Sequence, residues 1–321
     1  MNATLDVTTR RTFLRKGLPA VTLGAIILPR AGLAAARSSA SAIRLGGPVY
    51  VKTDDPAELA QAHRRLGYGA AYCPNVPLDD SARIRAVADA FAAVNVVIAE
   101  VGRWVNLMES DSAKRAANLR TVTEGLALAD AVGALCCVDI AGSYSKDAWY
   151  GPSPDNLSRR FFDEAVENAR KIIDAVKPRR AKFCYEMMGW AYPDSPESCL
   201  KLLKAVDRKG FGVHLDPCNL INSPTRFYQN TALLEECFDK LGRWIVSSHA
   251  KDLRWNLEMN IHFVEVRPGL GVLDYPTYLR RLSRLPQQPP MMMEHLSSAE
   301  EYDQARVHIF EVGKQIGIAF E

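Results

Sequence analysis

Four stretches in the second half of the chain each end in a carboxylate or an imidazole directly after a run of apolar residues. The four side chains are Glu186, Asp216, His249 and Glu294. Successive members are 30, 33 and 45 residues apart, which suits β-α-β units of roughly 30 residues or more. If each run is a barrel strand, the strand ends bring all four side chains to one point above the barrel axis.

These four residues are of the types that bind a divalent cation. Two Glu, one Asp and one His form an oxygen-rich set that suits Mn²⁺, Co²⁺ or Mg²⁺, and suits Zn²⁺ less well. A carboxylate at the end of an apolar strand carries a desolvation cost. Four such ends in succession indicate a shared cation rather than unrelated surface charges. The sequence therefore predicts one divalent metal ion per chain.

The elements that must position these residues alternate along the chain beyond about residue 41. The predicted strands are 43–51, 70–74, 95–101, 135–140, 182–187, 212–216, 244–249 and 291–295. The predicted helices are 56–66, 80–94, 112–132, 155–176, 195–206, 231–241, 275–285 and 298–316. Such alternation favours a parallel sheet, and eight units favour a closed (β/α)₈ barrel in a single domain. The alternative, an open doubly wound sheet, expects a glycine-rich phosphate turn that Leu45-Gly46-Gly47-Pro48 does not provide.

Several motifs are similar to those of a known family. They are Ile98-Ala99-Glu100-Val101-Gly102, His214-Leu215-Asp216-Pro217-Cys218-Asn219-Leu220, His249-Ala250-Lys251-Asp252, the segment 265–275 and Glu294-His295-Leu296. The chain resembles the xylose isomerase-like barrel superfamily of sugar phosphate isomerases and epimerases over everything that follows its first 36 residues. That superfamily also includes ketose 3-epimerases, inosose dehydratases and type IV apurinic endonucleases.

The resemblance implies roles for the strand-end residues. Glu186, Asp216, His249 and Glu294 match the ligands of a single metal ion, and Glu186 and Glu294 also match an acid/base pair. The implied chemistry is removal of a proton next to a carbonyl through an enediolate, with a small sugar or keto-sugar as substrate. A lyase, dehydratase or hydratase acting on a keto-sugar, an inosose or a 3-keto glycoside is the alternative, because it begins with the same proton abstraction.

Other polar residues near these motifs are candidates for substrate binding. Asn219 stands where several ketose epimerases carry His, and its amide can hydrogen-bond a hydroxyl but cannot donate a charged proton. Lys251 comes two residues after His249 and is expected to share its direction. An ion pair with Asp252 is the alternative for this lysine.

Further candidates lie in the loops and one layer deeper. Trp190 is a candidate for stacking beneath a sugar ring, and a core or lid role is the alternative. Arg254 and Arg267 are candidates for binding an anionic group, and a solvated surface position is the alternative. His214 comes two residues before Asp216, which predicts the same direction and a supporting role behind the metal ligands.

The first 36 residues are interpreted as an export signal, and residues 37–321 as the barrel domain. Arg10 and Arg11 precede an apolar run at 17–29 and then three alanines at 34–36. This pattern is typical of a signal peptide, and the paired arginines followed by Phe-Leu resemble the twin-arginine signal. The apolar run is short for a membrane span. We expect a periplasmic protein with no stable membrane span once the signal is cleaved; retention of the signal as an anchor is the alternative.

Charge and cysteine content narrow the function further. The first 36 residues contain five Lys/Arg and one Asp, so the chain's net charge of +3 falls to about −1 without them. That is mild evidence against a nucleic-acid partner, and six histidines are few for the trinuclear zinc centre of a repair endonuclease. The seven cysteines form no C-x-x-C and are expected to be core residues. A non-catalytic sugar-binding barrel and a homo-oligomer are both left open.

Overall fold

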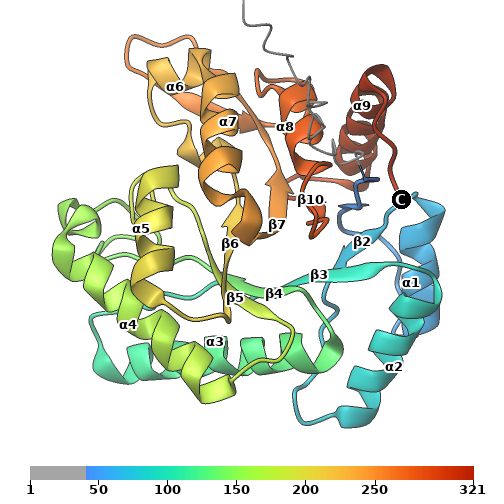
Figure 1. The fold of residues 1–321 in the computed structure, drawn as a ribbon, viewed down its shortest axis with the longest axis horizontal. Helices are drawn as coiled ribbons and strands as arrows, with labels where there is room; N and C mark the ends of the chain where they lie inside the picture. Colours follow the sequence, from blue (N-terminus) through green and yellow to red (C-terminus); the bar gives the residue numbers. More distant parts are fainter. Residues whose placement is uncertain (1–40) are drawn as a thin grey trace, which may run out of the picture. The chain divides into compact units, whose positions relative to one another are not determined.

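A computed structural model describes residues 41–321, so the predicted export signal lies outside the described residues. Eight parallel strands close into a barrel in the order β1-β10-β7-β6-β5-β4-β3-β2 (Figure 1). They are β1 (Leu45–Gly46), β2 (Ala70–Tyr72), β3 (Val97–Gly102), β4 (Cys136–Asp139), β5 (Lys182–Glu186), β6 (Phe211–Leu215), β7 (Ile245–Ala250) and β10 (Met291–Met293). The prediction of a closed barrel is confirmed, and the open sheet is excluded.

Helices follow the strands and surround them. They are α1 (Pro56–Arg65), α2 (Ser81–Ala93), α3 (Ser112–Val132), α4 (Arg159–Val176), α5 (Pro196–Val206), α6 (Pro224–Tyr228), α7 (Asn230–Leu241), α8 (Tyr275–Leu282) and α9 (Ala299–Ile316). Short 3₁₀ turns lie at Pro154–Leu157, Cys218–Leu220 and Gly242–Trp244. Side chains that accept hydrogen bonds from the first turn, such as Asp111 before α3 and Ser298 before α9, fix where the helices begin.

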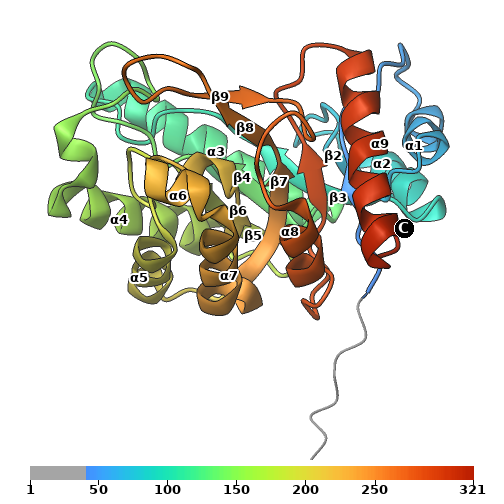
Figure 2. The same cartoon turned by 90° about the horizontal axis from the view of Figure 1, so that it is seen from above.

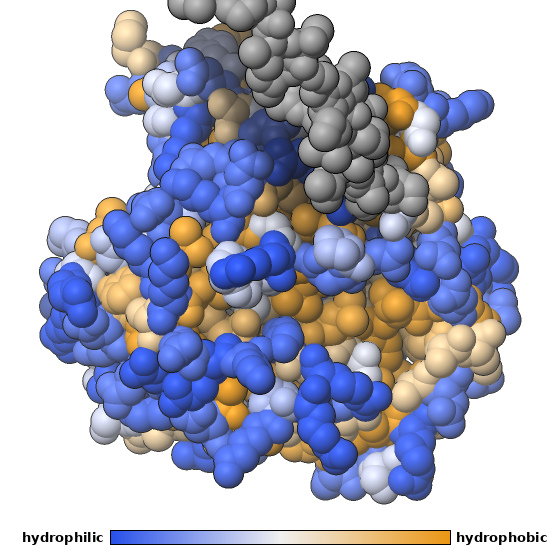
Figure 3. All heavy atoms as spheres, viewed as in Figure 1, coloured by the Kyte–Doolittle hydropathy of each residue, from blue (hydrophilic) through white to orange (hydrophobic). Residues whose placement is uncertain are grey.

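Apolar residues fill the space between the strands and the helices. Figure 3 shows hydrophobic residues toward the middle of one face and hydrophilic residues around its rim. All seven cysteines, which lie within the described range, are free, and six of them are buried. They therefore pack as small apolar side chains, as expected from their surroundings in the sequence.

No helix in the range 41–321 is long and apolar enough to cross a membrane.

A two-stranded antiparallel hairpin, absent from the sequence prediction, follows β7. It consists of β8 (Asp252–Trp255) and β9 (Phe263–Val266), with Trp255 paired to Phe263. The hairpin lies at the end of the barrel where the strands finish (Figure 2). Aromatic rings attach it to α6: Phe227 stacks on Phe263 with ring centroids 4.9 Å apart, and Trp255 meets the Phe227 ring nearly edge-on.

Asp252 anchors the segment that leads from this hairpin back to α8. Its buried carboxylate accepts hydrogen bonds from the backbone N–H groups of Leu253, Gly269, Gly271 and Leu273, at 2.9–3.1 Å. A Cβ on Gly271 would lie 2.1 Å from this carboxylate, so only glycine allows the approach. The Gly269-x-Gly271 motif thus turns the chain around Asp252.

We expect Asp252→Asn to lower the free energy of unfolding by about 2–4 kcal/mol. The amide NH₂ would face backbone N–H donors, and each buried N–H group left without an acceptor costs about 1–3 kcal/mol. Urea unfolding of the purified protein measures the change. Asp147→Asn, at an exposed loop position, is the matched control and should stay within about 0.5 kcal/mol; equal stability of the two variants would contradict the anchoring role.

Candidate metal and substrate site

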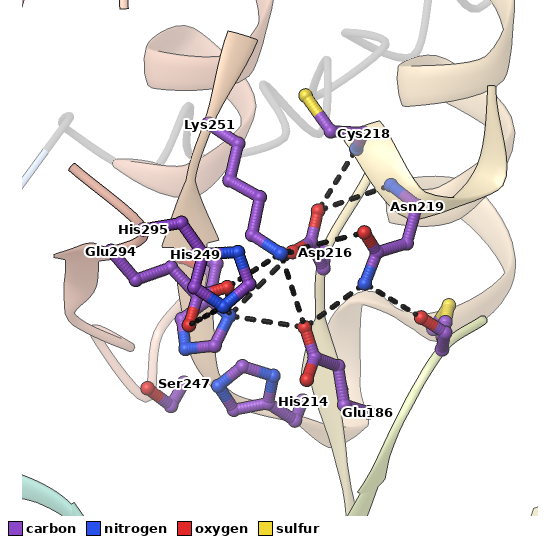
Figure 4. Close-up of polar contacts among 12 residues, drawn as sticks. Glu186, His214, Asp216, Cys218, Asn219, Ser247, His249, Lys251, Glu294 and His295 are labelled. Atoms are coloured by element: carbon purple, nitrogen blue, oxygen red, sulfur yellow. Dashed lines mark hydrogen bonds and ion pairs between the residues drawn. The ribbon is translucent and has the colours of Figure 1, made fainter. Parts of the chain in front are cut away.

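The four predicted strand-end residues meet at one end of the barrel (Figure 4). Glu186 ends β5, Asp216 follows β6, His249 lies in β7, and Glu294 follows β10. One ligand atom from each lies within 4.8 Å of those of the other three. His249 Nδ1 is 2.7 Å from Glu294 Oε1, 3.1 Å from Glu186 Oε1 and 3.5 Å from Asp216 Oδ2. The convergence of these four side chains, predicted from their spacing in the sequence, is therefore present in the fold.

This cluster fits a divalent cation. Ligands about 2.0–2.2 Å from one ion are separated from one another by distances of the size observed here. Asp216 Oδ2 and Glu294 Oε1 are buried oxygens that, within residues 41–321, have charged neighbours but accept no well-directed hydrogen bond. A buried oxygen whose hydrogen-bonding capacity is not filled is unfavourable. A cation at the centre of the four side chains would satisfy both.

Lys251 lies against the same carboxylates. Its ammonium Nζ is 2.6 Å from Glu294 Oε1, 2.9 Å from Asp216 Oδ2 and 3.8 Å from Glu186 Oε1. Burial disfavours its charge, but these carboxylates outweigh burial and raise the pKa of Lys251 above its ordinary value. Three carboxylates and one ammonium leave two negative charges, which a divalent ion balances. The alternative of an ion pair with Asp252 is wrong, because Asp252 is occupied by backbone N–H groups.

The two glutamates of the cluster differ in their affinity for a proton. Burial raises the pKa of Glu186 above its ordinary value, against an opposing effect of His249. Burial also acts on Glu294, but His249 and Lys251 outweigh it and hold the pKa of Glu294 at about 2. Environments that separate the pKa values of two carboxyls are what an acid/base pair requires.

Glu100, at the inner side of the cluster, holds His249 in place. Its Oε1 is 3.2 Å from His249 Nε2, and its Oε2 is 2.9 Å from both His214 Nε2 and Ser247 Oγ. All four side chains are buried. Because Nε2 of His249 contacts Glu100, the other ring nitrogen, Nδ1, faces the three carboxylates. His214 lies behind the four candidate ligands, where the sequence placed it, with its ring centroid 4.1 Å from that of His249.

We expect Glu100→Gln to weaken binding of Mn²⁺ by about 10–100-fold, the usual effect of losing a carboxylate that orients a metal-binding histidine. Isothermal titration of the metal-stripped protein with Mn²⁺ measures the change. Glu124→Gln, a substitution at an exposed position on α3, is the control. An unchanged affinity in Glu100→Gln would mean that the barrel alone orients His249.

A cavity of about 610 Å³ opens beside the cluster. At its inner end lie Glu100, Glu186, Asn219, Lys251 and Glu294. Its other lining residues are largely aromatic: Tyr72, Trp104, Trp149, Tyr150, Trp190 and Tyr302. Clefts of roughly 300–1,000 Å³ with a few convergent polar groups are typical of small-molecule sites. The cavity would therefore give a small molecule access to the two glutamates.

The sequence matches one protein family over residues 60–311, which is most of the chain. That family is described as the xylose isomerase-like TIM barrel. The chain belongs to this family. The resemblance drawn from the motifs is thereby confirmed. A comparison with curated proteins finds no match.

Solved structures of other xylose isomerase-like proteins share the fold at low identity. A xylose isomerase-like TIM barrel protein from Mycobacterium smegmatis, in complex with magnesium, is 17% identical, with a TM-score of 0.61 over 85% of this chain and 97% of that one. The 3-keto-D-glucoside 4-epimerase from E. coli is 13% identical, with a TM-score of 0.61 over 85% and 99%. The D-psicose 3-epimerase from Clostridium cellulolyticum H10, with D-tagatose, is 12% identical, with a TM-score of 0.62 over 86% and 100%.

The residues predicted to bind substrate in this xylose isomerase-like barrel fall into two groups. Asn219, Lys251 and Trp190 line the cavity. The Asn219 amide donates to Glu186 Oε1 at 3.0 Å and its Oδ1 lies 3.4 Å from Lys251 Nζ, so it positions both. Arg254 and Arg267 instead line a neighbouring cavity with Glu301, to which Arg267 is ion-paired at 3.3 Å. Neither arginine lines the cavity beside Glu186 and Glu294, because Arg254 is exposed on the hairpin and Arg267 is held by Glu301; their contact with an anionic group stays a prediction.

Proposed function

We propose that the protein is a divalent-metal-dependent isomerase or epimerase of carbohydrates that moves a proton next to a carbonyl group. The observation that carries the proposal is the convergence of Glu186 and Glu294 on one buried centre at the inner end of a substrate-sized cavity. Family membership adds support, as do the sugar epimerases among the structures with this fold.

The chain's own residues supply the proton transfer. Glu186 and Glu294 extend from different strands, so each can approach a substrate carbon from its own side, one to remove a proton and the other to return one. Asn219 holds the Glu186 carboxylate through its amide. The Lys251 ammonium is placed to donate a hydrogen bond to a substrate oxygen as negative charge develops on it.

Glu186, Asp216, His249 and Glu294 would hold the ion, which we propose to be Mn²⁺, Co²⁺ or Mg²⁺, with Zn²⁺ less favoured. When bound, it supplies positive charge beside neighbouring substrate oxygens and so makes the adjacent C–H bond more acidic.

The proposal is tested by following keto-sugars in D₂O by NMR with the metal-stripped protein and with the protein reloaded with Mn²⁺. A panel of ketoses, keto-glycosides and inososes covers the substrate classes. We expect deuterium at the carbon next to the carbonyl, and an isomer as product, only with the reloaded protein. Metal uptake without exchange in any compound of the panel would favour a sugar-binding barrel instead.

We also propose that the protein works outside the cytoplasm. Support comes from the paired arginines and the apolar run within residues 1–36. Replacing Arg10 and Arg11 together by Lys should leave an uncleaved precursor in the cytoplasm, detected by cell fractionation and immunoblotting. Normal delivery of this double variant to the periplasm would refute the assignment.

A further inference from the structure

The cavity has two chemically different ends. The metal-binding carboxylates and Lys251 form its inner end, whereas large rings from the loops after β3, β4 and β5 line another part. These rings are Trp104, Trp149, Tyr150 and Trp190. Proton transfer at the carboxylates uses none of them, so the aromatic part needs its own explanation.

The rings are held in place although each is open to solvent. Trp104, Trp149 and Trp190 are 42, 39 and 38% exposed, which is a cost for side chains that gain from burial. The Trp190 indole N–H donates to the carbonyl of Tyr150 at 2.6 Å, which joins the loops after β4 and β5. The Trp149 and Tyr150 rings meet edge to face with centroids 5.3 Å apart.

Trp104 lies close to Gly102, and the backbone next to it is held by a hydrogen bond. A Cβ on Gly102 would lie 2.8 Å from the Trp104 indole nitrogen, so glycine there lets the ring lie close to the chain. The next residue, Val105, donates its N–H to the buried carboxylate of Asp139 at 3.1 Å. An aromatic wall whose members are fixed but uncovered is the arrangement expected of a surface that stacks on a ligand ring.

The volume and the charged residues of the cavity restrict the ligand that could stack on this wall. A volume of about 610 Å³ lies well inside the range, roughly 300–1,000 Å³, of pockets that enclose drug-sized molecules. One sugar ring is much smaller than this cavity, so a single ring at the carboxylates cannot cover all of the aromatic wall. Among residues 41–321, no arginine lines this cavity, and its basic residues Lys251 and His295 are already paired with carboxylates. Within the described residues, the cavity therefore offers no unpaired basic side chain to a phosphate group.

We propose that the substrate is an uncharged glycoside of two rings, an inference that rests on the proposed function. The sugar ring that carries the carbonyl group lies against Glu186 and Glu294. The second ring, joined through the glycosidic oxygen, stacks on the wall formed by Trp104, Trp149 and Trp190. Either a second sugar or an aromatic aglycone offers the required flat, uncharged face.

The test compares probes that differ only in the second ring. They are the methyl and phenyl 3-keto-β-D-glucopyranosides, 3-ketocellobiose with its ketone in the non-reducing ring, and the 6-phosphate of the methyl compound. Titration calorimetry with the full Mn²⁺-loaded chain should show binding about tenfold tighter for each two-ring probe than for the methyl glycoside. The phosphate should bind more weakly than the methyl glycoside. Tighter binding by only one two-ring probe identifies the nature of the second ring.

Two variants test whether the aromatic wall causes the difference in affinity between the two-ring probes and the methyl glycoside. Trp190→Ala and Trp104→Ala should each reduce the tenfold preference for two-ring probes over the methyl glycoside toward unity. Trp244→Ala, whose ring lies against Arg243 outside the cavity, is the matched control. Equal affinity for the methyl and two-ring probes in the unaltered protein would overturn the inference, as would tighter binding of the phosphate.

Deuterium uptake from D₂O, measured in the same samples, separates this inference from the proposed function. Exchange in every probe without preference for two rings would leave the proposed chemistry standing and overturn the inference. A preference that the Trp variants abolish, without exchange in any probe, would support the binding site and contradict the proposed chemistry.

Discussion

Glu186→Gln and Glu294→Gln are each expected to lower turnover by about 10²–10⁴-fold, the usual contribution of a general acid or base. Glutamine keeps an oxygen that can face the metal but cannot accept or deliver the proton. Metal binding should therefore weaken far less than turnover falls. Initial rates of product formation with the Mn²⁺-loaded variants, together with Mn²⁺ titrations, measure the two effects separately.

The two variants should also differ from one another. The glutamate that removes the proton is needed for any exchange of substrate hydrogen with D₂O, whereas the other glutamate is needed only for delivery. One variant should therefore still exchange hydrogen without forming product. Glu258→Gln, an exposed change in the hairpin loop, is the control. Near-normal turnover in either site variant would remove that glutamate from the mechanism.

The same pair of measurements separates an isomerase from a lyase. In a lyase, departure of a leaving group replaces delivery of a proton to carbon. The two variants should then differ more strongly, and the product should be unsaturated. In an isomerase or epimerase, both glutamates are needed for product, and the product keeps the composition of the substrate.

The barrel and its four strand-end residues could be predicted because each depends on local sequence. Short apolar runs at regular intervals determine the strands, and the residue that follows each run is brought inward by the geometry of a parallel barrel. The spacing from Glu186 to Asp216 to His249 therefore indicated convergence directly. The boundaries were less accurate at β1, predicted over 43–51 and observed as Leu45–Gly46, because the apolar residues that follow the strand belong to a loop.

Glu100 could not be assigned its role in the same way. It lies in β3, and whether a carboxylate there reaches His249 depends on packing across the barrel interior, between residues 149 positions apart. Besides its place in the motif Ile98-Ala99-Glu100-Val101-Gly102, its signal in the sequence was a charged residue inside an otherwise apolar strand, Val97–Gly102. A buried charge of this kind requires partners, so a search for partners among the histidines of later strands could have found it.

The hairpin of β8 and β9 was missed for a different reason. Its strands are four residues each and only partly buried, and they are stabilised by Phe227 on α6, which no local pattern connects to them. Because Arg254 lies in this hairpin, the missed element also explains why Arg254 lines the neighbouring cavity and not the one beside Glu186. The direction of a loop side chain depends on secondary structure that tertiary contacts stabilise. A role assigned to a loop residue only because it is near a motif in the sequence cannot take this into account.

Lys251→Met is expected to act in opposite directions on metal affinity and on turnover. The ammonium lies 2.6 and 2.9 Å from two oxygens that would bind the ion. In a buried site the repulsion between two cations sharing these oxygens is strong, so removing Lys251 should tighten Mn²⁺ binding by about tenfold or more. Turnover should fall by about 10²–10³-fold, the effect of losing one donor to an oxygen on which charge develops.

Methionine suits this test because it keeps an unbranched side chain of similar length and removes the charge and the donor. Lys182→Met is the matched control, since Lys182 begins β5 and donates to the carbonyl of Lys209 at 2.6 Å, outside the cavity. Titration calorimetry and initial rates on the same preparations give both quantities. If Lys251 serves instead to hold the carboxylates in place for the ion, Lys251→Met would weaken Mn²⁺ binding along with turnover, and the competition between the two cations would be disproved. Tighter metal binding with lower turnover would mean that Lys251 acts on the substrate. It would also mean that the protein keeps this lysine although its charge weakens metal binding.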